Sequence, residues 1–202
     1  MKTKLISLSI ILMTLSCASQ KKEQAPSKPS LKVNHKSIRP GTAVKARGNS
    51  LRLYKGSIDV GDNFIEKAKG TGLGFDFKNK VTIISIVPSI DTKVCEEQTH
   101  ILGESKAISP EVDLVTISRD LPMAQMRFAK EAKLTNIRYY SDYKYGKFGK
   151  KTGLLIRDKE LLTRAVLVLD KKGIIRHRQL VSEITELPDM DKAIEISHSL
   201  LK

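Results

Sequence analysis

Cysteine is scarce in this chain of 202 residues, which holds only two of them, Cys17 and Cys95. They form no Cys-x-x-Cys dithiol, which argues against a dithiol disulfide oxidoreductase. The cysteines and the four histidines also lack the spacing of a zinc site, so we expect no metal and no cofactor. His100 follows Cys95 by about 140° of helical rotation, which predicts a surface position away from the thiol. The remaining histidines with no ligand spacing are His35, His177 and His198.

Acidic residues are also few, since the chain has 22 of them and 36 lysines and arginines, which gives a formal net charge of +14. Such a balance admits nucleic acid or an anionic membrane surface as a partner. We find no Lys/Arg-rich block with interleaved aromatics, so we expect no nucleic acid. A soluble basic protein is the interpretation we favour.

The N-terminus carries the pattern of an export signal. Lys2 and Lys4 precede an apolar run, Leu5–Leu15, which is too short to span a bilayer and ends before small residues. Residues 1–16 are therefore predicted to be a signal peptide. Cys17 directly after the run resembles the lipobox of bacterial lipoproteins, although Thr14 stands where that motif usually has leucine. We expect a lipid-anchored protein of the bacterial cell envelope, acylated at Cys17. An ordinary signal peptide with an incidental cysteine is the alternative.

Residues 17–46 contain lysines and prolines but few apolar residues, which predicts a flexible, lipid-anchored tether. Its lysines could rest on anionic lipid, or the segment could be a plain solvated spacer. The folded domain is predicted to occupy residues 47–202.

Within that domain, apolar runs rich in β-branched residues predict strands buried on both faces. These runs are 81–87, 112–117 and 165–169. Helices are predicted from Cys95 to about Ala107, from Pro122 to about Lys133, and after Pro188. The turn at 170–173 predicts a hairpin between 165–169 and 174–181, and the glycines between 47 and 60 suggest a leading β-hairpin. We expect one α/β domain with a mixed central sheet flanked by helices.

Cys95 would lie after a buried strand, in the first turn of a helix. Open α/β sheets usually carry their sites at that edge, and the amide donors and dipole of a helix N-terminus favour a thiolate. Glu96 and Glu97 would oppose the thiolate, so a fixed cation is also needed. Thr92 can direct its hydroxyl to the same place, or can cap the helix. From spacing alone, a catalytic cysteine and a packed one both remain open.

The stretch Pro88–Cys95, PSIDTKVC, resembles the P-x-x-x-T-x-x-C signature of peroxiredoxins, and in particular the thiol peroxidase subfamily. Further motifs of that subfamily follow in order through the rest of the domain. They are Ile117–Gln125, Arg127–Phe128, Arg164–Val166, Val168–Asp170, Leu180–Thr185 and Pro188–Asp189.

The resemblance implies a thioredoxin-like fold and a peroxidase that reduces hydrogen peroxide and organic hydroperoxides with a cysteine thiolate. By the same resemblance, Cys95 would be the peroxidatic residue and Thr92 would hydrogen-bond thiolate and peroxide. Arg164 would stabilise the thiolate and the leaving oxygen, supplying the missing cation. Pro88 would shield the pocket from water. The family also implies a homodimer.

The chain departs from the family where a resolving cysteine usually follows Arg127-Phe128, because Ala129 stands there. We therefore predict a one-cysteine mechanism with an exported thiol or thioredoxin-like reductant. Cys17 is the only other thiol, and acylation would remove it. The alternative is a thioredoxin-fold peroxide sensor or binding module that does not turn over. Gly61–Phe64 is shorter than the family's segment, and the glycines of 70–74 are interpreted as a turn rather than a phosphate loop.

Overall fold

The computed structural model describes residues 31–202 except residue 78, and Leu31–Lys202 forms one compact unit. The predicted signal peptide, Cys17 and the first part of the predicted tether lie outside the described residues. Among the helices that are described, none has the length and apolarity needed to cross a bilayer.

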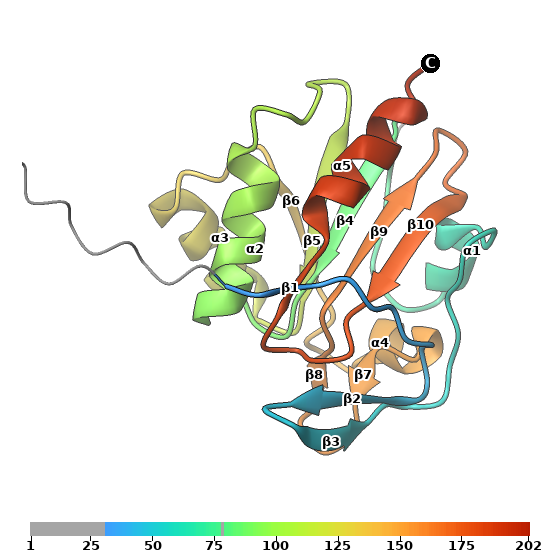
Figure 1. Cartoon of the computed structure of the whole chain (residues 1–202), viewed down its shortest axis with the longest axis vertical. Coiled ribbons are helices and arrows are strands. Elements are labelled where there is room, and N and C mark those ends of the chain that lie inside the picture. The colour runs from blue at the N-terminus through green and yellow to red at the C-terminus, as the bar shows by residue number, and fades with distance from the viewer. Residues whose placement is uncertain (1–30, 78) are drawn as a thin grey trace, which may run out of the picture. The chain divides into compact units, whose positions relative to one another are not determined.

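A five-stranded sheet runs through the unit in the order β10-β9-β4-β5-β6 (Figure 1). Its strands are β4 (Thr82–Ile86), β5 (Asp113–Ser118), β6 (Arg138–Ser141), β9 (Ala165–Leu169) and β10 (Ile175–Leu180). β4, β5 and β6 are parallel, whereas β9 is antiparallel to both β4 and β10. The mixed sheet and the β9–β10 hairpin are thus confirmed. Every residue of β4 and β9 is buried, as expected for strands covered on both faces.

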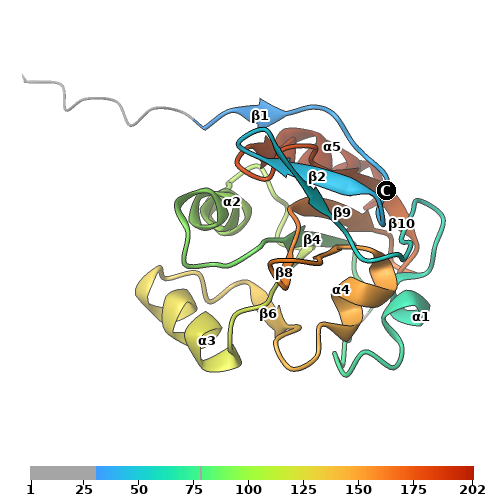
Figure 2. The ribbon, with the colours of Figure 1, turned by 90° about the horizontal axis from the view of Figure 1, so that it is seen from below.

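Helices cover both faces of this sheet (Figure 2). α2 (Lys93–Glu104) and α5 (Met190–Ser199) lie on one face, and α1 (Phe64–Ala68) and α4 (Lys147–Thr152) lie on the other. α3 (Pro122–Glu131) packs beside β6. The helices expected near 95–107, 122–133 and after Pro188 are confirmed.

The alternation of side chains along the strands divides the interior into two clusters. Ile83 of β4 belongs to the cluster under α2 and α5, which includes Leu102 and Ile194. Ile84 belongs to the opposite cluster, where Phe64 of α1 and Phe148 of α4 are fully buried. Because the sheet and both clusters lie inside Leu31–Lys202, this unit carries its own core.

The folded unit begins earlier than the predicted boundary at residue 47. β1 (Val33–Asn34) pairs in parallel with β11 (Leu187–Pro188), and β2 (Ala43–Ala46) forms a hairpin with β3 (Asn49–Arg52). The predicted leading hairpin therefore exists, but it starts on the N-terminal side of the expected region. Its turn uses Arg47 and Gly48, both with positive φ, as the right-handed twist of two-residue hairpins favours.

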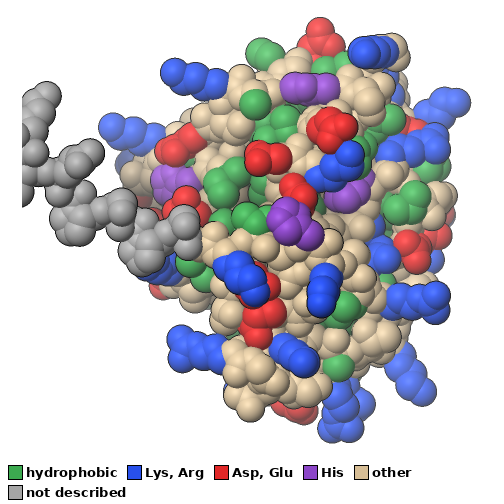
Figure 3. All heavy atoms as spheres, in the orientation of Figure 1, with side chains coloured by type: hydrophobic (Ala, Val, Ile, Leu, Met, Phe, Trp, Pro, Cys, Tyr) green, Lys and Arg blue, Asp and Glu red, His purple; other side chains and the backbone are tan. Residues whose placement is uncertain are grey.

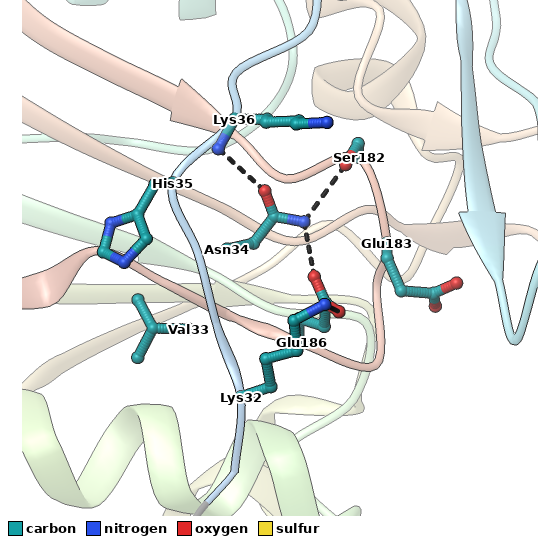
Figure 4. Close-up of a pocket in the computed structure, with 8 residues that line it drawn as sticks. All are labelled: Lys32, Val33, Asn34, His35, Lys36, Ser182, Glu183 and Glu186. Atoms are coloured by element: carbon teal, nitrogen blue, oxygen red, sulfur yellow. Dashed lines mark hydrogen bonds and ion pairs between the residues drawn. The ribbon is translucent and has the colours of Figure 1, made fainter.

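The tether prediction is wrong for residues 31–46, which polar contacts hold against the end of β10. The Ile38 amide donates to Leu180 O at 3.0 Å and the Lys45 amide donates to Ser182 O at 2.8 Å. Figure 4 shows the Asn34 side chain directed at the loop that follows β10. There the Asn34 amide donates to Ser182 Oγ at 3.0 Å and to Glu186 at 2.6 Å. Val44 is the one apolar side chain of residues 31–46 that is buried in the core, which is too sparse a signal for the hydrophobic pattern to reveal.

Candidate active site

Cys95 lies on the third residue of α2, just beyond the carboxyl end of β4. Its side chain is fully buried and is a free thiol. The loop before α2 is fixed by Asp120, which follows β5. The Asp120 carboxylate accepts hydrogen bonds from the Ser89 hydroxyl at 2.6 Å and from the Ile90 amide at 2.8 Å. The parallel pairing of β4 and β5 therefore positions the start of α2.

Thr92 directs its hydroxyl at the sulfur, as predicted. Its Oγ1 donates to Cys95 Sγ at 3.0 Å and lies 3.3 Å from Ser89 O. Thr92 occupies the residue before the helix in an extended conformation, but its side chain makes no capping hydrogen bond. The helix-cap role is therefore not used here, and the hydroxyl serves the thiol.

Arg164 supplies the fixed positive charge that a thiolate needs beside Glu96 and Glu97. It lies directly before β9 with 2% of its surface exposed, and its Nη2 donates to Cys95 Sγ at 3.2 Å. Nη1 donates to Gln98 Oε1 at 2.7 Å, and Nε donates to Ile184 O at 2.8 Å. Burial lowers the pKa of Arg164, while the charge and hydrogen bond of Cys95 raise it. A guanidinium remains charged under such a shift, so the sulfur has a permanent cationic neighbour.

Gln98 is a site residue that the sequence interpretation missed. It is fully buried one turn after Cys95, and its Nε2 donates to Ser85 Oγ at 2.8 Å and to Ala165 O at 3.3 Å. Its Oε1 is thereby turned toward Arg164. Residues three apart share a helix face, so the spacing from Cys95 was a usable signal.

The surroundings of the sulfur are otherwise apolar. Val87, Ile90 and half-buried Phe128 pack against Cys95, and they too were missed. Pro88 is buried in the loop that follows β4, beside these residues. Contact with apolar side chains keeps bulk water from the thiol and strengthens the hydrogen bonds from Thr92 and Arg164.

The other polar candidates near the helix lie away from the sulfur. Glu96 is exposed, and His100 Nδ1 lies 2.9 Å from Glu104 on the outer side of α2, which agrees with the predicted surface position of the histidine. Ala129, where the family's resolving cysteine would stand, is buried in α3. Within the described residues, no group of histidine, cysteine and acidic side chains is arranged to hold a metal ion. The glycines between 70 and 74 form a turn and bend that opens no helix.

A buried thiol held by a hydroxyl and a guanidinium defines the class of cysteine-dependent redox enzymes, because those donors stabilise negative charge on sulfur and on an incoming oxygen. Comparison with known proteins specifies the class. A family profile described as Redoxin matches residues 71–194. The thiol peroxidase of Halalkalibacterium halodurans is 38% identical over 164 residues, covering 79% of this chain and 99% of that protein. That of Staphylococcus aureus strain MRSA252 is 42% identical over 158 residues, covering 76% and 96%.

Solved structures agree in fold. A peroxiredoxin-like protein from Aquifex aeolicus superposes with a TM-score of 0.68 at 32% identity, covering 81% of this chain and 99% of that one. A thiol peroxidase from Chromobacterium violaceum reaches a TM-score of 0.63 at 17% identity, which speaks for the fold alone. The chain belongs to the Redoxin family, as a peroxiredoxin of the thiol peroxidase type with a thioredoxin-like fold, and it is a thiol-dependent peroxidase.

Proposed function

We propose that Cys95 is the peroxidatic residue of a one-cysteine cycle. The Cys95 thiolate attacks the terminal oxygen of a hydroperoxide, the O–O bond breaks, and the alkoxide or hydroxide takes a proton and leaves as alcohol or water. Cys95 is left as a sulfenic acid. The observation that carries this proposal is the position of Sγ, 3.0 Å from the Thr92 hydroxyl and 3.2 Å from the Arg164 guanidinium.

Each neighbour has a distinct part in this step. Arg164 carries a charge that stabilises the thiolate before attack and the oxygen that becomes negative during it. Thr92 donates to the thiolate and can align the peroxide beside it. Gln98 and Ile184 O hold the guanidinium in place at 2.7 and 2.8 Å. Pro88, buried at the start of the loop that leads to α2, shields the thiol from water.

Regeneration requires an outside thiol, because Ala129 replaces the resolving residue and the sequence has no cysteine in the folded unit besides Cys95. A first thiolate attacks the sulfenic sulfur, forming a mixed disulfide and releasing water. A second thiolate attacks the partner's sulfur and returns Cys95 to its thiolate, leaving an external disulfide. For an exported enzyme the reductant must also lie outside the cytoplasm, as a thiol or a thioredoxin-like protein.

The export signal and the lipobox-like Cys17 support placement at the bacterial cell envelope through a lipid anchor. Mass spectrometry of the native protein is expected to find a mature chain that begins with acylated Cys17. A mature N-terminus elsewhere in the sequence would contradict the anchor, and would favour an ordinary signal peptide.

A homodimer is also proposed, on the family resemblance and on exposed apolar residues near α3. Leu121, Met123 and Met126 are 48%, 71% and 71% exposed, an unusual concentration for one short segment. Sedimentation equilibrium is expected to give twice the chain mass for Leu31–Lys202, and a monomer at micromolar concentration would contradict the proposal.

The enzymatic proposal is tested by peroxide consumption in excess dithiothreitol. The variant Cys95→Ser should abolish turnover, whereas Cys17→Ser should retain it. Turnover that survives in Cys95→Ser would overturn the role of Cys95. Stoichiometric oxidation of the wild-type chain that no thiol reverses would instead favour the sensor.

A further inference from the structure

The face that carries α5 and β1 has its acidic and histidine side chains gathered toward the middle, with many lysines and arginines projecting around the rim (Figure 3). Several charges on this side are paired. Lys32 lies 2.7 Å from Glu186, Lys192 lies 2.8 Å from Glu195, and His35 lies 2.8 Å from Asp189. Such pairs reduce the repulsion that a large net positive charge causes within the protein.

The lysines of the segment after β6, unlike the charges just described, are not paired with acidic residues that the structure describes. Aromatic rings and lysines alternate here, in a group called the basic tyrosine patch: Tyr143, Lys144, Tyr145, Lys147 and Lys150. The expectation that the chain lacks a lysine-rich block with interleaved aromatics is therefore wrong for this segment. None of its three lysines forms an ion pair with any other described residue. The ammonium groups of Lys144 and Lys147 each lie 5.5 Å from the centre of the Tyr145 ring. Lys150 Nζ donates to Tyr145 O at 3.1 Å.

The patch is held firmly by the fold beneath it. Phe148 is fully buried, and the Asp142 carboxylate accepts the amide hydrogens of Phe148 at 3.1 Å and Gly149 at 2.9 Å. Asp142 is itself buried, so it presents little charge to the surface. The two tyrosine side chains are exposed to solvent, Tyr143 by 41% and Tyr145 by 60%. The five patch residues therefore present cations and aromatic rings together, and the exposed carboxylate at their border, Glu160, accepts a hydrogen bond from Tyr54 beside Lys150.

A recess of about 350 Å³ opens beside the patch, and its wall is completed by the loop Thr71–Leu73. The recess and the patch follow the carboxyl end of β6, which is parallel to β4. They consequently lie at the same edge of the sheet as the loop that leads to Cys95.

We propose that the basic tyrosine patch docks on the surface of an anionic lipid bilayer, independently of any anchor at Cys17. Lysines close to such a surface each add to binding through attraction to the lipid phosphates. Tyrosine rings with a polar tip favour the headgroup region. The five patch residues include no arginine. Arg119 and Arg157 border them, but Arg119 is engaged by Asp142 O and Glu160, and Arg157 lies over the Tyr54 ring. Recognition of a nucleic acid or of a specific acidic protein usually relies on the fixed fork of an arginine that is free to pair. Docking brings the Cys95 edge of the sheet toward the bilayer.

The test uses the unit Leu31–Lys202, which carries its own core. Co-sedimentation is measured with vesicles of phosphatidylglycerol and phosphatidylcholine in a 3:7 ratio and with vesicles of phosphatidylcholine alone, at about 0.1 M salt. We expect binding to the anionic vesicles only, weakening as salt rises. The triple variant Lys144→Gln/Lys147→Gln/Lys150→Gln should lower the partition coefficient by about 10- to 100-fold.

The matched control removes the same charge at the opposite edge of the sheet, with Lys106→Gln/Lys171→Gln/Lys172→Gln, and is expected to bind nearly as well as the parent. Equal loss in both triple variants would show a general charge effect and overturn the patch. Absence of binding to the anionic vesicles would overturn it as well. Patch-dependent binding to polyglutamate or to a DNA oligonucleotide, without binding to vesicles, would reject the bilayer in favour of a soluble polyanion. Circular dichroism confirms that each variant is folded.

Discussion

The guanidinium of Arg164 lies 3.2 Å from the sulfur of Cys95, although 69 positions separate the two residues in the sequence. β9 and β4 are adjacent antiparallel strands, so the residue that precedes β9 meets the loop that follows β4. The sheet topology thus supplies the positive charge that the acidic first turn of α2 lacks. Replacements of the thiol's neighbours and changes of pH test this arrangement.

Arg164→Lys should slow oxidation of Cys95 by hydrogen peroxide by about 100-fold. The three guanidinium nitrogens each donate to a different acceptor, namely the sulfur, Gln98 and Ile184 O, and the single nitrogen of a lysine cannot reach all three. The second-order rate constant is measured by competition with a peroxidase of known rate. Arg176→Lys is the control, since Arg176 is exposed and paired with Asp170 at 2.7 Å. Equal rates in the parent and Arg164→Lys would contradict the role of the guanidinium.

Thr92→Val should lower the same rate constant by roughly 10- to 100-fold, the usual effect of losing a hydrogen bond to a charged group. Thr92→Ser keeps the hydroxyl and should recover most of the activity. If serine proves as slow as valine, the shape of the threonine side chain matters more than its hydrogen bond to Sγ.

Gln98→Leu should reduce the oxidation rate while leaving Cys95 in place, since the guanidinium would lose the acceptor at 2.7 Å that orients it. We expect about a tenfold effect, consistent with one lost hydrogen bond to a charged group. Gln98→Met has nearly the volume of the parent side chain but lacks the amide oxygen, so it should be as slow as Gln98→Leu. A role confined to packing predicts that Gln98→Met recovers the rate, and comparing the two variants separates these possibilities.

Ala129→Cys should convert the enzyme to a two-cysteine cycle. Phe128 packs against Cys95, so α3 borders the site, and partial unwinding of the first turn of α2 would let the two sulfurs meet. Intact-mass analysis after one equivalent of peroxide should show the loss of two hydrogens in this variant. Ala132→Cys, at the end of α3, serves as control. Failure of Ala129→Cys to form the disulfide would contradict the proposed local opening.

Acid should destabilise the fold through His177. Burial lowers the pKa of this imidazole below its ordinary value of 6.5, with Lys192 and Arg178 acting in the same direction and Asp189 opposing them. Its Nε2 is buried without a hydrogen-bond partner among the described residues. The unfolded chain therefore binds a proton more readily, so this contribution to stability is present above pH 6.5 and falls as the pH drops toward the lower folded-state pKa. Urea denaturation at pH 7.5 and pH 5.5 should show a smaller difference in His177→Gln than in the parent. An unchanged difference would assign the acid sensitivity to other groups.

The sequence was sufficient to predict the central strands and main helices, because 81–87, 112–117 and 165–169 carry dense apolar runs that only a two-sided core explains. β6 was missed because all of its residues are only half-buried and its sequence, RYYS, lacks such a run. Residues 31–46 were misassigned as a tether because they are held on the end of β10 mainly by hydrogen bonds, which the apolar pattern of the sequence does not reveal. In the site, the family motifs led to Cys95, Thr92 and Arg164. Gln98 shares a helix face with Cys95, a signal that the spacing offered, whereas Phe128 meets the thiol only through the packing of α3.

The chemical fate of Cys95 after a single turnover separates a peroxidatic cysteine from an inert buried thiol. Leu31–Lys202, which lacks Cys17, is treated with one equivalent of hydrogen peroxide and trapped with dimedone, and a parallel sample receives a small thiol. We predict a dimedone adduct on Cys95 alone, and in the parallel sample a mixed disulfide on Cys95 that a second thiol resolves, with two thiols consumed per peroxide. A Cys95 thiol that stays unmodified while peroxide persists would contradict its peroxidatic role.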